Sequence, residues 1–243
     1  MQFVGTSAPA GGLAIRKLNE RIDAPLTWKL RNMARWGFIK GWIAKHIVAP
    51  FANSFGVMTA VAELTLRKRT WYEDVEREHF LKLMRANRSA EAERYAAERT
   101  YWIDYGVVGY RVVTNAGVAY IVDDFDNGSG SADVSLFNFH GVGTGNTAEA
   151  AGDTALVTES TTALNPDSTR ATGTRSQPAA NQFRSTGTLS FDTGPTALVE
   201  HGLFTQAATG GGTLLDRTVF ATVTIQSGES LQCEYTITFT AGS

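Results

Sequence analysis

The sequence predicts an α+β protein in two parts, and two observations carry this prediction. Residues 1–111 contain 18 Lys and Arg against 11 Asp and Glu, whereas residues 112–243 contain 4 against 13. Apolar residues recur at helical spacing in the first part and in short alternating runs between Gly-rich turns in the second. We therefore expect an extended arm and a helical, basic anchoring region over residues 1–111. An antiparallel β-sandwich of jelly-roll or immunoglobulin-like type is expected over residues 112–243.

The basic part begins with a Gly- and Ala-rich stretch over residues 1–12, which is expected to be extended. From Leu13 to Ala49, apolar residues at helical spacing are interleaved with Lys and Arg. This pattern predicts one or more amphipathic basic helices, which Pro50 would end. An alternating, partly β-branched run then predicts a strand from Val57 to Arg69.

A second helical region is expected after that strand. Thr70 would open it, because Glu73 lies three positions later and the two residues form a capping-box pattern. The polar Asn87-Arg88-Ser89 step is expected to interrupt the helical region, which resumes from Ala90 to Arg99.

The acidic part contains seven short alternating runs, each of which predicts a strand. Its Thr209–Gly212 and Gln226–Glu229 steps have the composition of hairpin turns. The predicted strands cover residues 133–140, 155–161, 169–174, 181–192, 197–206, 213–225 and 230–240.

Tryptophan and arginine are concentrated in the basic helical region. Such a helix can lie on a membrane surface, bind nucleic acid, dock against an acidic protein surface, or pack on the second helical region as core. Protein interfaces are enriched in Trp and Arg, which favours docking on a protein over membrane or nucleic acid as the partner. The interface residues predicted on this basis are Trp28, Arg31, Arg35, Trp36 and Trp42.

Three features of the sequence limit the compartment and the chemistry that we expect for this protein. Charged residues and Pro50 interrupt the most apolar stretch, residues 36–62, so no membrane span is expected. The first residues lack the pattern of a signal peptide. A single cysteine, Cys233, excludes an intrachain disulfide framework and any cysteine-based zinc site; it is expected to be a buried structural thiol.

No arrangement of residues predicts catalysis. The chain lacks a Gly-x-Ser-x-Gly elbow, a His-Glu-x-x-His helix and a P-loop. The glycine cluster from His140 to Gly145 is better explained as a strand-to-loop transition than as a dinucleotide loop. Asp123, Asp124 and Asp126 lack the acidic twelfth ligand of a calcium loop and predict an acidic turn. We therefore expect no enzyme activity, no small-molecule substrate and no cofactor.

The four histidines, His46, His79, His140 and His201, have no metal-ligand spacing along the chain. His140 and His201 are the two that folding could bring together. The expected role of each is that of a structural, hydrogen-bonded side chain.

The acidic part resembles a family of tailed-bacteriophage virion proteins over about residues 112–239. The resemblance depends on the order of several short motifs, each weak alone. These are Val113-Thr114-Asn115-Ala116-Gly117, Phe139 to Gly145, Asp153-Thr154-Ala155-Leu156 with Glu159, Arg170-Ala171-Thr172-Gly173-Thr174, Ala179 to Arg184, Glu200-His201-Gly202-Leu203-Phe204 and Leu214-Leu215-Asp216-Arg217. The resemblance implies that the protein is a particle component with a small β-sandwich and no catalytic residues.

The functional expectation is a structural component of the virion, assembled in the host bacterial cytoplasm. A capsid decoration or cement protein that binds the major capsid protein is preferred, and a homo-oligomer is expected, with a trimer as one arrangement. A tail, collar or baseplate adaptor is the alternative, with another virion protein as its partner. A carbohydrate-binding sandwich is a second alternative, but its aromatic residues occupy alternating positions that predict core: Phe137, Phe139, Phe183, Phe191 and Phe204.

Overall fold

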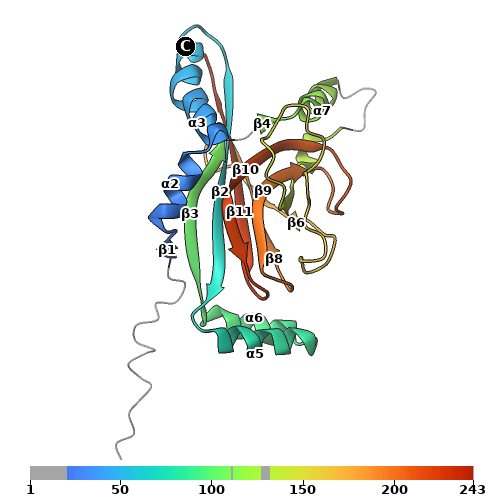
Figure 1. Cartoon of the computed structure of the whole chain (residues 1–243). Coiled ribbons are helices and arrows are strands. Elements are labelled where there is room, and N and C mark those ends of the chain that lie inside the picture. Colours follow the sequence, from blue (N-terminus) through green and yellow to red (C-terminus); the bar gives the residue numbers. More distant parts are fainter. Residues whose placement is uncertain (1–20, 111, 127–131, 243) are drawn as a thin grey trace, which may run out of the picture.

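A computed structural model describes residues 21–110, 112–126 and 132–242, and it shows an α+β architecture with two sheets (Figure 1). The N-terminal extended segment predicted over residues 1–12 and the predicted helix start at Leu13 lie outside the described residues. In spatial order, sheet A contains β1 (Arg21–Asp23), β3 (Thr100–Tyr110), β2 (Thr59–Trp71), β11 (Ser230–Thr240), β8 (Gln182–Ser190) and β7 (Thr174–Ser176). Sheet B contains β4 (Val112–Val113), β10 (Leu214–Ile225), β9 (Thr196–Phe204), β5 (Phe139–Gly143) and β6 (Ala171–Thr172).

The largest core cluster lies between the two sheets. It takes Leu64, Val108 and Leu231 from sheet A and Leu198 and Phe220 from sheet B, all fully buried. Because alternate residues of a strand point to opposite faces, each sheet contributes one apolar face to this core. The sheets are antiparallel except that β1 runs parallel to β3.

The predicted division between residues 111 and 112 does not separate two structural units, and we correct it here. Strand β2, from the basic part, pairs with β11, from the acidic part, continuously from Thr59↔Thr240 to Arg69↔Ser230. Backbone hydrogen bonds along this whole length join the two segments in one sheet. The shift in charge along the sequence is therefore not a domain boundary.

Five of the predicted strands appear close to their expected positions: β2, β8, β9, β10 and β11. Residues 155–161 form a loop, with only an isolated bridge from Glu159 to Gly143. The 133–140 run begins with the 3-10 turn η2 (Val134–Leu136), and the 169–174 run is reduced to the short β6. Thr209–Gly212 lies in a β9–β10 hairpin, but Gln226–Glu229 carries the chain from sheet B to sheet A, so the predicted hairpin there is wrong.

The basic helices are α2 (Leu26–Met33), α3 (Trp36–Ile43), the π-helical η1 (Ala44–Val48) and α4 (Ala49–Asn53). The prediction that Pro50 ends the helix is wrong. The π turn moves the hydrogen-bond register, so the Ala49 amide bonds to the carbonyl of Ala44, five residues back. Pro50 then occupies the first turn of α4, where a missing N–H costs little.

The second helical region consists of α5 (Asp74–Arg85) and α6 (Ser89–Ala97), which cover one end of β2 and β3 (Figure 1). The predicted break is confirmed, since Asn87 has a φ of 57°. The predicted capping box is wrong, because Thr70 belongs to β2 and its hydroxyl donates to the Glu229 carboxylate instead. Helix α5 begins after Glu73, whose side chain makes no capping hydrogen bond.

Helix α7 (Asn115–Asp126) was not predicted. It places Asp123, Asp124 and Asp126 on its last turns, where an acidic turn was expected. Thr114 caps it by accepting from the Gly117 amide at 2.9 Å. Gly117 permits close packing on β10, because a Cβ there would lie 2.5 Å from the carbonyl oxygen of Leu215.

Candidate functional site

The helices α3, η1 and α4, which we call the arm, run as one continuous helical segment from Trp36 to Asn53 and project past the ends of the sheets (Figure 1). Gly41 lets α3 approach β3, because a Cβ at this position would lie 2.2 Å from the Tyr110 Cβ. An ion pair between Lys45 and Glu63, 2.6 Å apart, joins the arm to β2. Burial, and then the Glu63 charge, raises the pKa of Tyr110. The arm is therefore held at its base and open along its outer surface.

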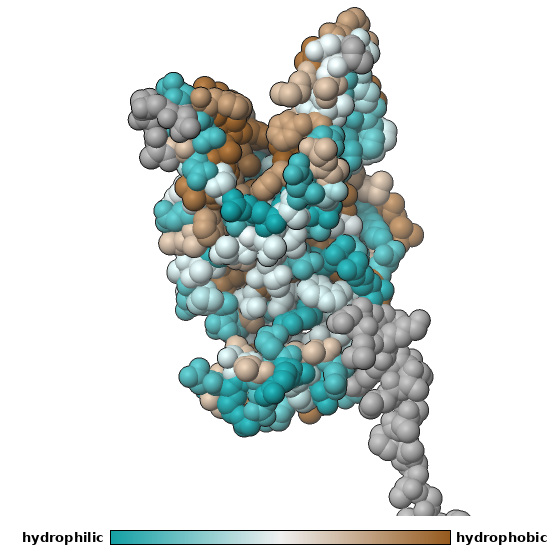
Figure 2. Space-filling view, turned by 180° about the vertical axis from the view of Figure 1, so that it is seen from behind, coloured by the Kyte–Doolittle hydropathy of each residue, from teal (hydrophilic) through white to brown (hydrophobic). Residues whose placement is uncertain are grey.

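Apolar side chains are exposed along the arm and the turn that follows it, and we call this surface the arm patch. Phe51 is 66% exposed, Phe55 71% and Met58 68%. The other members of the patch are Trp36, Trp42, Ile43, Ile47, Val48 and Val57. Figure 2 shows brown, hydrophobic surface on this projection and on the neighbouring one. A contiguous exposed apolar surface of this kind marks an interaction site.

The second projection is α7, which exposes Val118, Val122 and Phe125. Between it and the arm the surface is hollowed (Figure 2). A hollow of about 750 Å³ at this end of the molecule is lined by Met58, Phe183 and Phe239 among apolar residues, and by Arg175 and Gln182 among polar ones. The arm patch thus continues through Met58 into a concave surface that a partner side chain could fill.

The arm and the helix before it are basic. Residues 24–62 contain five Lys and Arg and no Asp or Glu. Lys40 is exposed beside Trp36, with its ammonium 5.9 Å from the centre of the indole ring. Positive charge around an apolar, aromatic patch favours a partner whose contact surface is apolar at its centre and acidic at its rim.

Of the five predicted interface residues, Trp36 and Trp42 are exposed on the arm, at 66% and 45%. Arg31 is exposed on α2, and Arg35 is half-buried between α2 and α3. The prediction for Trp28 is wrong, because this residue is 7% exposed and belongs to the core between the sheets. Its ring packs edge-on against Tyr105 at 4.6 Å between centroids, and its Nε1 donates to the carbonyl of Thr222.

Helix α2 closes one open side between the sheets through two polar bridges. Asn32, 1% exposed, donates to the Val108 carbonyl of β3 at 2.7 Å and accepts from the Ala221 amide of β10 at 2.9 Å. Trp28 adds the bond to Thr222 of β10. Because the arm follows α2 directly, these bonds fix the direction in which the arm leaves the sheets.

The pKa of Tyr105, whose ring contacts Trp28 of α2, reports how deeply this side chain is buried. Burial raises the pKa of Tyr105 to about 12, with the Glu229 charge as the second cause. The unfolded chain ionises this group near pH 10, so its contribution to stability is complete below that pH and is lost as pH rises through about 12. We expect Tyr105 to lower the free energy of unfolding by about 2–3 kcal/mol over this window. Denaturant unfolding of wild type and Tyr105→Phe at several pH values should show a difference that changes only there; a difference independent of pH would contradict the prediction.

Two carboxylates beside sheet B are paired with fully buried arginines, Arg217 and Arg170. Glu200 bonds to Arg217 at 2.8 Å, and both residues are fully buried. Glu159 holds Arg170 through two bonds, at 2.6 and 3.0 Å. Each guanidinium also bonds to carbonyl oxygens of neighbouring loops, so we assign these pairs to loop anchoring.

The aromatic residues considered for carbohydrate binding do not form an exposed face. Phe137, Phe191 and Phe204 are buried, as their alternating positions predicted. Phe139 and Phe183 are half-buried and pack against core clusters. The sequence analysis missed the surface that is exposed, because Phe51 and Phe55 follow Pro50, where the helix was expected to end.

Comparisons of the chain with protein-family models, with curated proteins and with solved structures give no match. Over the described ranges, no helix is both long enough and apolar enough to cross a membrane.

Proposed function

We propose that this protein is a non-catalytic structural component of a tailed-phage particle and that it docks on a neighbouring virion protein through the arm patch. The observation that carries the proposal is the arm itself: a projecting helical segment whose apolar residues face outward while its base is bonded to the sheets. Exposing that much apolar surface is unfavourable in water, so a partner that covers it is expected. The ordered motifs of residues 112–239, which resemble a family of tailed-phage virion proteins, support a particle as the place where that partner is found.

A capsid decoration or cement role is the preferred form of this proposal, with the major capsid protein as the partner. The facing sheets would then be a sandwich of jelly-roll or immunoglobulin-like type, which is supported by the chain crossing between sheets after β8 and again after β10. A tail, collar or baseplate adaptor would use the same arm. A homo-oligomer is also proposed, with the basic arm of one copy near the acidic residues of another.

The proposal is tested first on purified particles. Quantitative mass spectrometry should find this chain in hundreds of copies, comparable with the shell subunit, if it is a decoration protein. A handful to a few dozen copies would assign it to the tail, collar or baseplate. Its absence from the particle would overturn the structural proposal.

The arm patch is tested by a variant with a matched control. Phe51→Asp with Phe55→Asp places two charges in the contact, and we expect incorporation into particles to fall at least about tenfold, since losing hot-spot aromatics costs about 2 kcal/mol or more each. Val157→Asp, at an exposed residue outside the arm patch (52% exposed), should leave incorporation unchanged. Equal incorporation of the arm variant and wild type would show that the arm is not the contact. Binding of the wild-type chain to anionic vesicles but not to particles would favour a membrane surface instead.

A further inference from the structure

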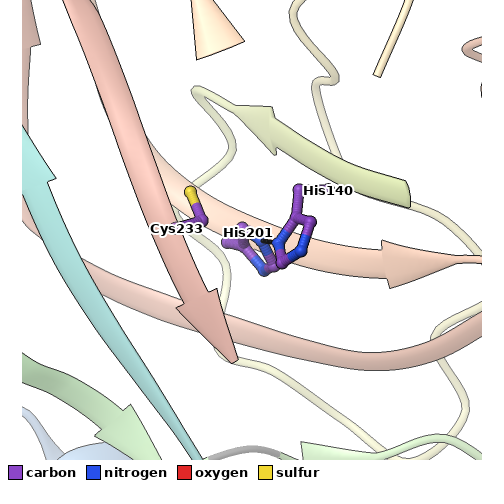
Figure 3. Close-up of side chains that lie close together, drawn as sticks. All are labelled: His140, His201 and Cys233. Carbon is purple, nitrogen blue, oxygen red and sulfur yellow. Dashed lines mark hydrogen bonds between the residues drawn. The ribbon is translucent and has the colours of Figure 1, made fainter. Parts of the chain in front are cut away.

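Three side chains that carry metal-binding atoms meet in the core, far from the arm patch. His140 comes from β5 and His201 from β9, the adjacent strand of sheet B, while Cys233 comes from β11 of sheet A (Figure 3). All three are fully buried. One ring nitrogen of each histidine and the Cys233 Sγ lie within 4.8 Å of one another. No spacing along the chain identifies this group, because its members are brought together only when the two sheets face each other.

The hydrogen bonds around His140 decide which of its nitrogens faces the group. The Asn138 amide donates to the Gly173 carbonyl at 2.6 Å, so its oxygen accepts from the Ser185 hydroxyl at 2.8 Å. Ser185 has then used its proton and accepts from His140 Nε2, at 2.9 Å. The lone pair of His140 Nδ1 therefore points at His201 Nε2, 3.0 Å away.

This arrangement is the one that metal sites use. A ligating histidine donates its second ring N–H to a neighbouring acceptor, which fixes the tautomer and the ring orientation. Here Ser185 and Asn138 supply that support from a different sheet and a different loop. Gly187 makes room for the ring, because a Cβ there would lie 2.5 Å from His140 Cδ2.

We propose that His140 Nδ1, His201 Nε2 and Cys233 Sγ form a structural site for a d¹⁰ metal ion, Cu⁺ or Zn²⁺. Two imidazoles and a thiolate suit borderline and soft ions, whereas calcium and magnesium require oxygen ligands. Nitrogens on one tetrahedral zinc ion lie roughly 3.3 Å apart, so the ring nitrogens need to separate by only a few tenths of an ångström. One thiolate balances the charge of Cu⁺, which suits a fully buried site.

Binding replaces the hydrogen bond between the two histidines. The metal takes the place of the proton that His201 Nε2 donates to His140 Nδ1, and this proton moves to Nδ1 of the His201 ring, which stays neutral. Cys233 loses its thiol proton to solvent as the metal–sulfur bond forms. The ion then joins β5 and β9 of one sheet to β11 of the other, which would hold the two sheets together.

The first test measures metal content of the full chain, purified without chelator from cells grown with added zinc or copper. One zinc or copper per chain is expected, and elemental analysis distinguishes the two ions. X-ray absorption at the metal edge should give a sulfur at about 2.3 Å and nitrogens, for zinc, at about 2.0–2.1 Å. A metal-free product together with no binding of Zn²⁺, Cu⁺ or Co²⁺ added during refolding would overturn the proposal. X-ray absorption that detects no sulfur among the atoms bound to the metal would also overturn the proposal.

Variants separate a ligand role from a packing role. Cys233→Ala removes the thiolate with little change in volume, and we expect it to abolish the thiolate-to-cobalt charge-transfer absorption of the Co²⁺-loaded protein. Ser185→Ala leaves the three ligands and removes the support of His140, which should weaken metal affinity by roughly 10–100-fold. His79→Gln, at an exposed histidine on α5, should bind metal as wild type does. Charge-transfer absorption that persists in Cys233→Ala would contradict the site, and circular dichroism confirms that each variant is folded.

Discussion

Trp28→Ala should destabilise the protein by about 3–5 kcal/mol, the usual cost of truncating a large buried aromatic side chain to alanine. Two losses act together. The cavity lies between the sheets, where the indole ring now contacts Tyr105 at 4.6 Å between centroids. The Thr222 carbonyl also loses the indole N–H that reaches it at 2.8 Å; because Thr222 is exposed, water can replace this donor, and the cavity is the larger of the two losses.

Trp36→Ala is the matched control, because it removes the same kind of side chain eight positions further along the same basic region, at a site that is 66% exposed. Its effect on stability should stay within about 0.5 kcal/mol. Urea unfolding followed by circular dichroism measures both variants without relying on tryptophan fluorescence. Similar losses at the two positions would contradict the assignment of Trp28 to the core and Trp36 to the surface.

This pair also shows what the sequence could not decide. The helical spacing and the basic residues correctly predicted helices with Trp28, Trp36 and Trp42 on them, but spacing alone does not tell which tryptophan meets the core. The partner of Trp28 is Thr222, and the partners of Asn32 are Val108 and Ala221. Contacts across so many intervening residues leave no local pattern.

The two-part division failed for a related reason. The shift from basic to acidic composition is real, but strand pairing depends on registers between distant segments, and β2 finds its partner in β11. Strands β8 to β11 were predicted well because each has a clean alternation between turn residues. Helix α7 lies between the helix predicted to end at Arg99 and the first strand predicted at residue 133, where no element was expected, and its signal is the Thr114 cap before Asn115.

The charged residues in the motifs of the acidic part acquire a common physical role. Arg170 is bonded to Glu159, to the Gln206 and Gly211 carbonyls, and lies over the Phe204 ring. Arg217 is bonded to Glu200 and Asp153. These bonds hold the long loop of residues 144–170, which has no regular strand or helix, against sheet B. Motifs that were individually weak as sequence signals therefore contain the groups that anchor this loop.

Arg217→Met should accordingly lower the free energy of unfolding by about 3–5 kcal/mol, the cost of leaving one partner of a buried ion pair alone. Glu200 would keep only the backbone amides of Gly145, Val157 and Thr158 as donors to its buried carboxylate. Adding Glu200→Gln removes the uncompensated charge, so the double variant should recover part of the loss.

The control for this effect is an ion pair nearer to solvent. Arg184 lies 3.6 Å from Glu234, with side chains 33% and 21% exposed, and Arg184→Met should cost only about 0–1 kcal/mol. Urea unfolding gives the free energies, and limited proteolysis should cut residues 144–170 first in Arg217→Met, because the loop is released before the sheets. If Arg217→Met were as stable as Arg184→Met, the loop would be held by packing against sheet B and not by its buried charges.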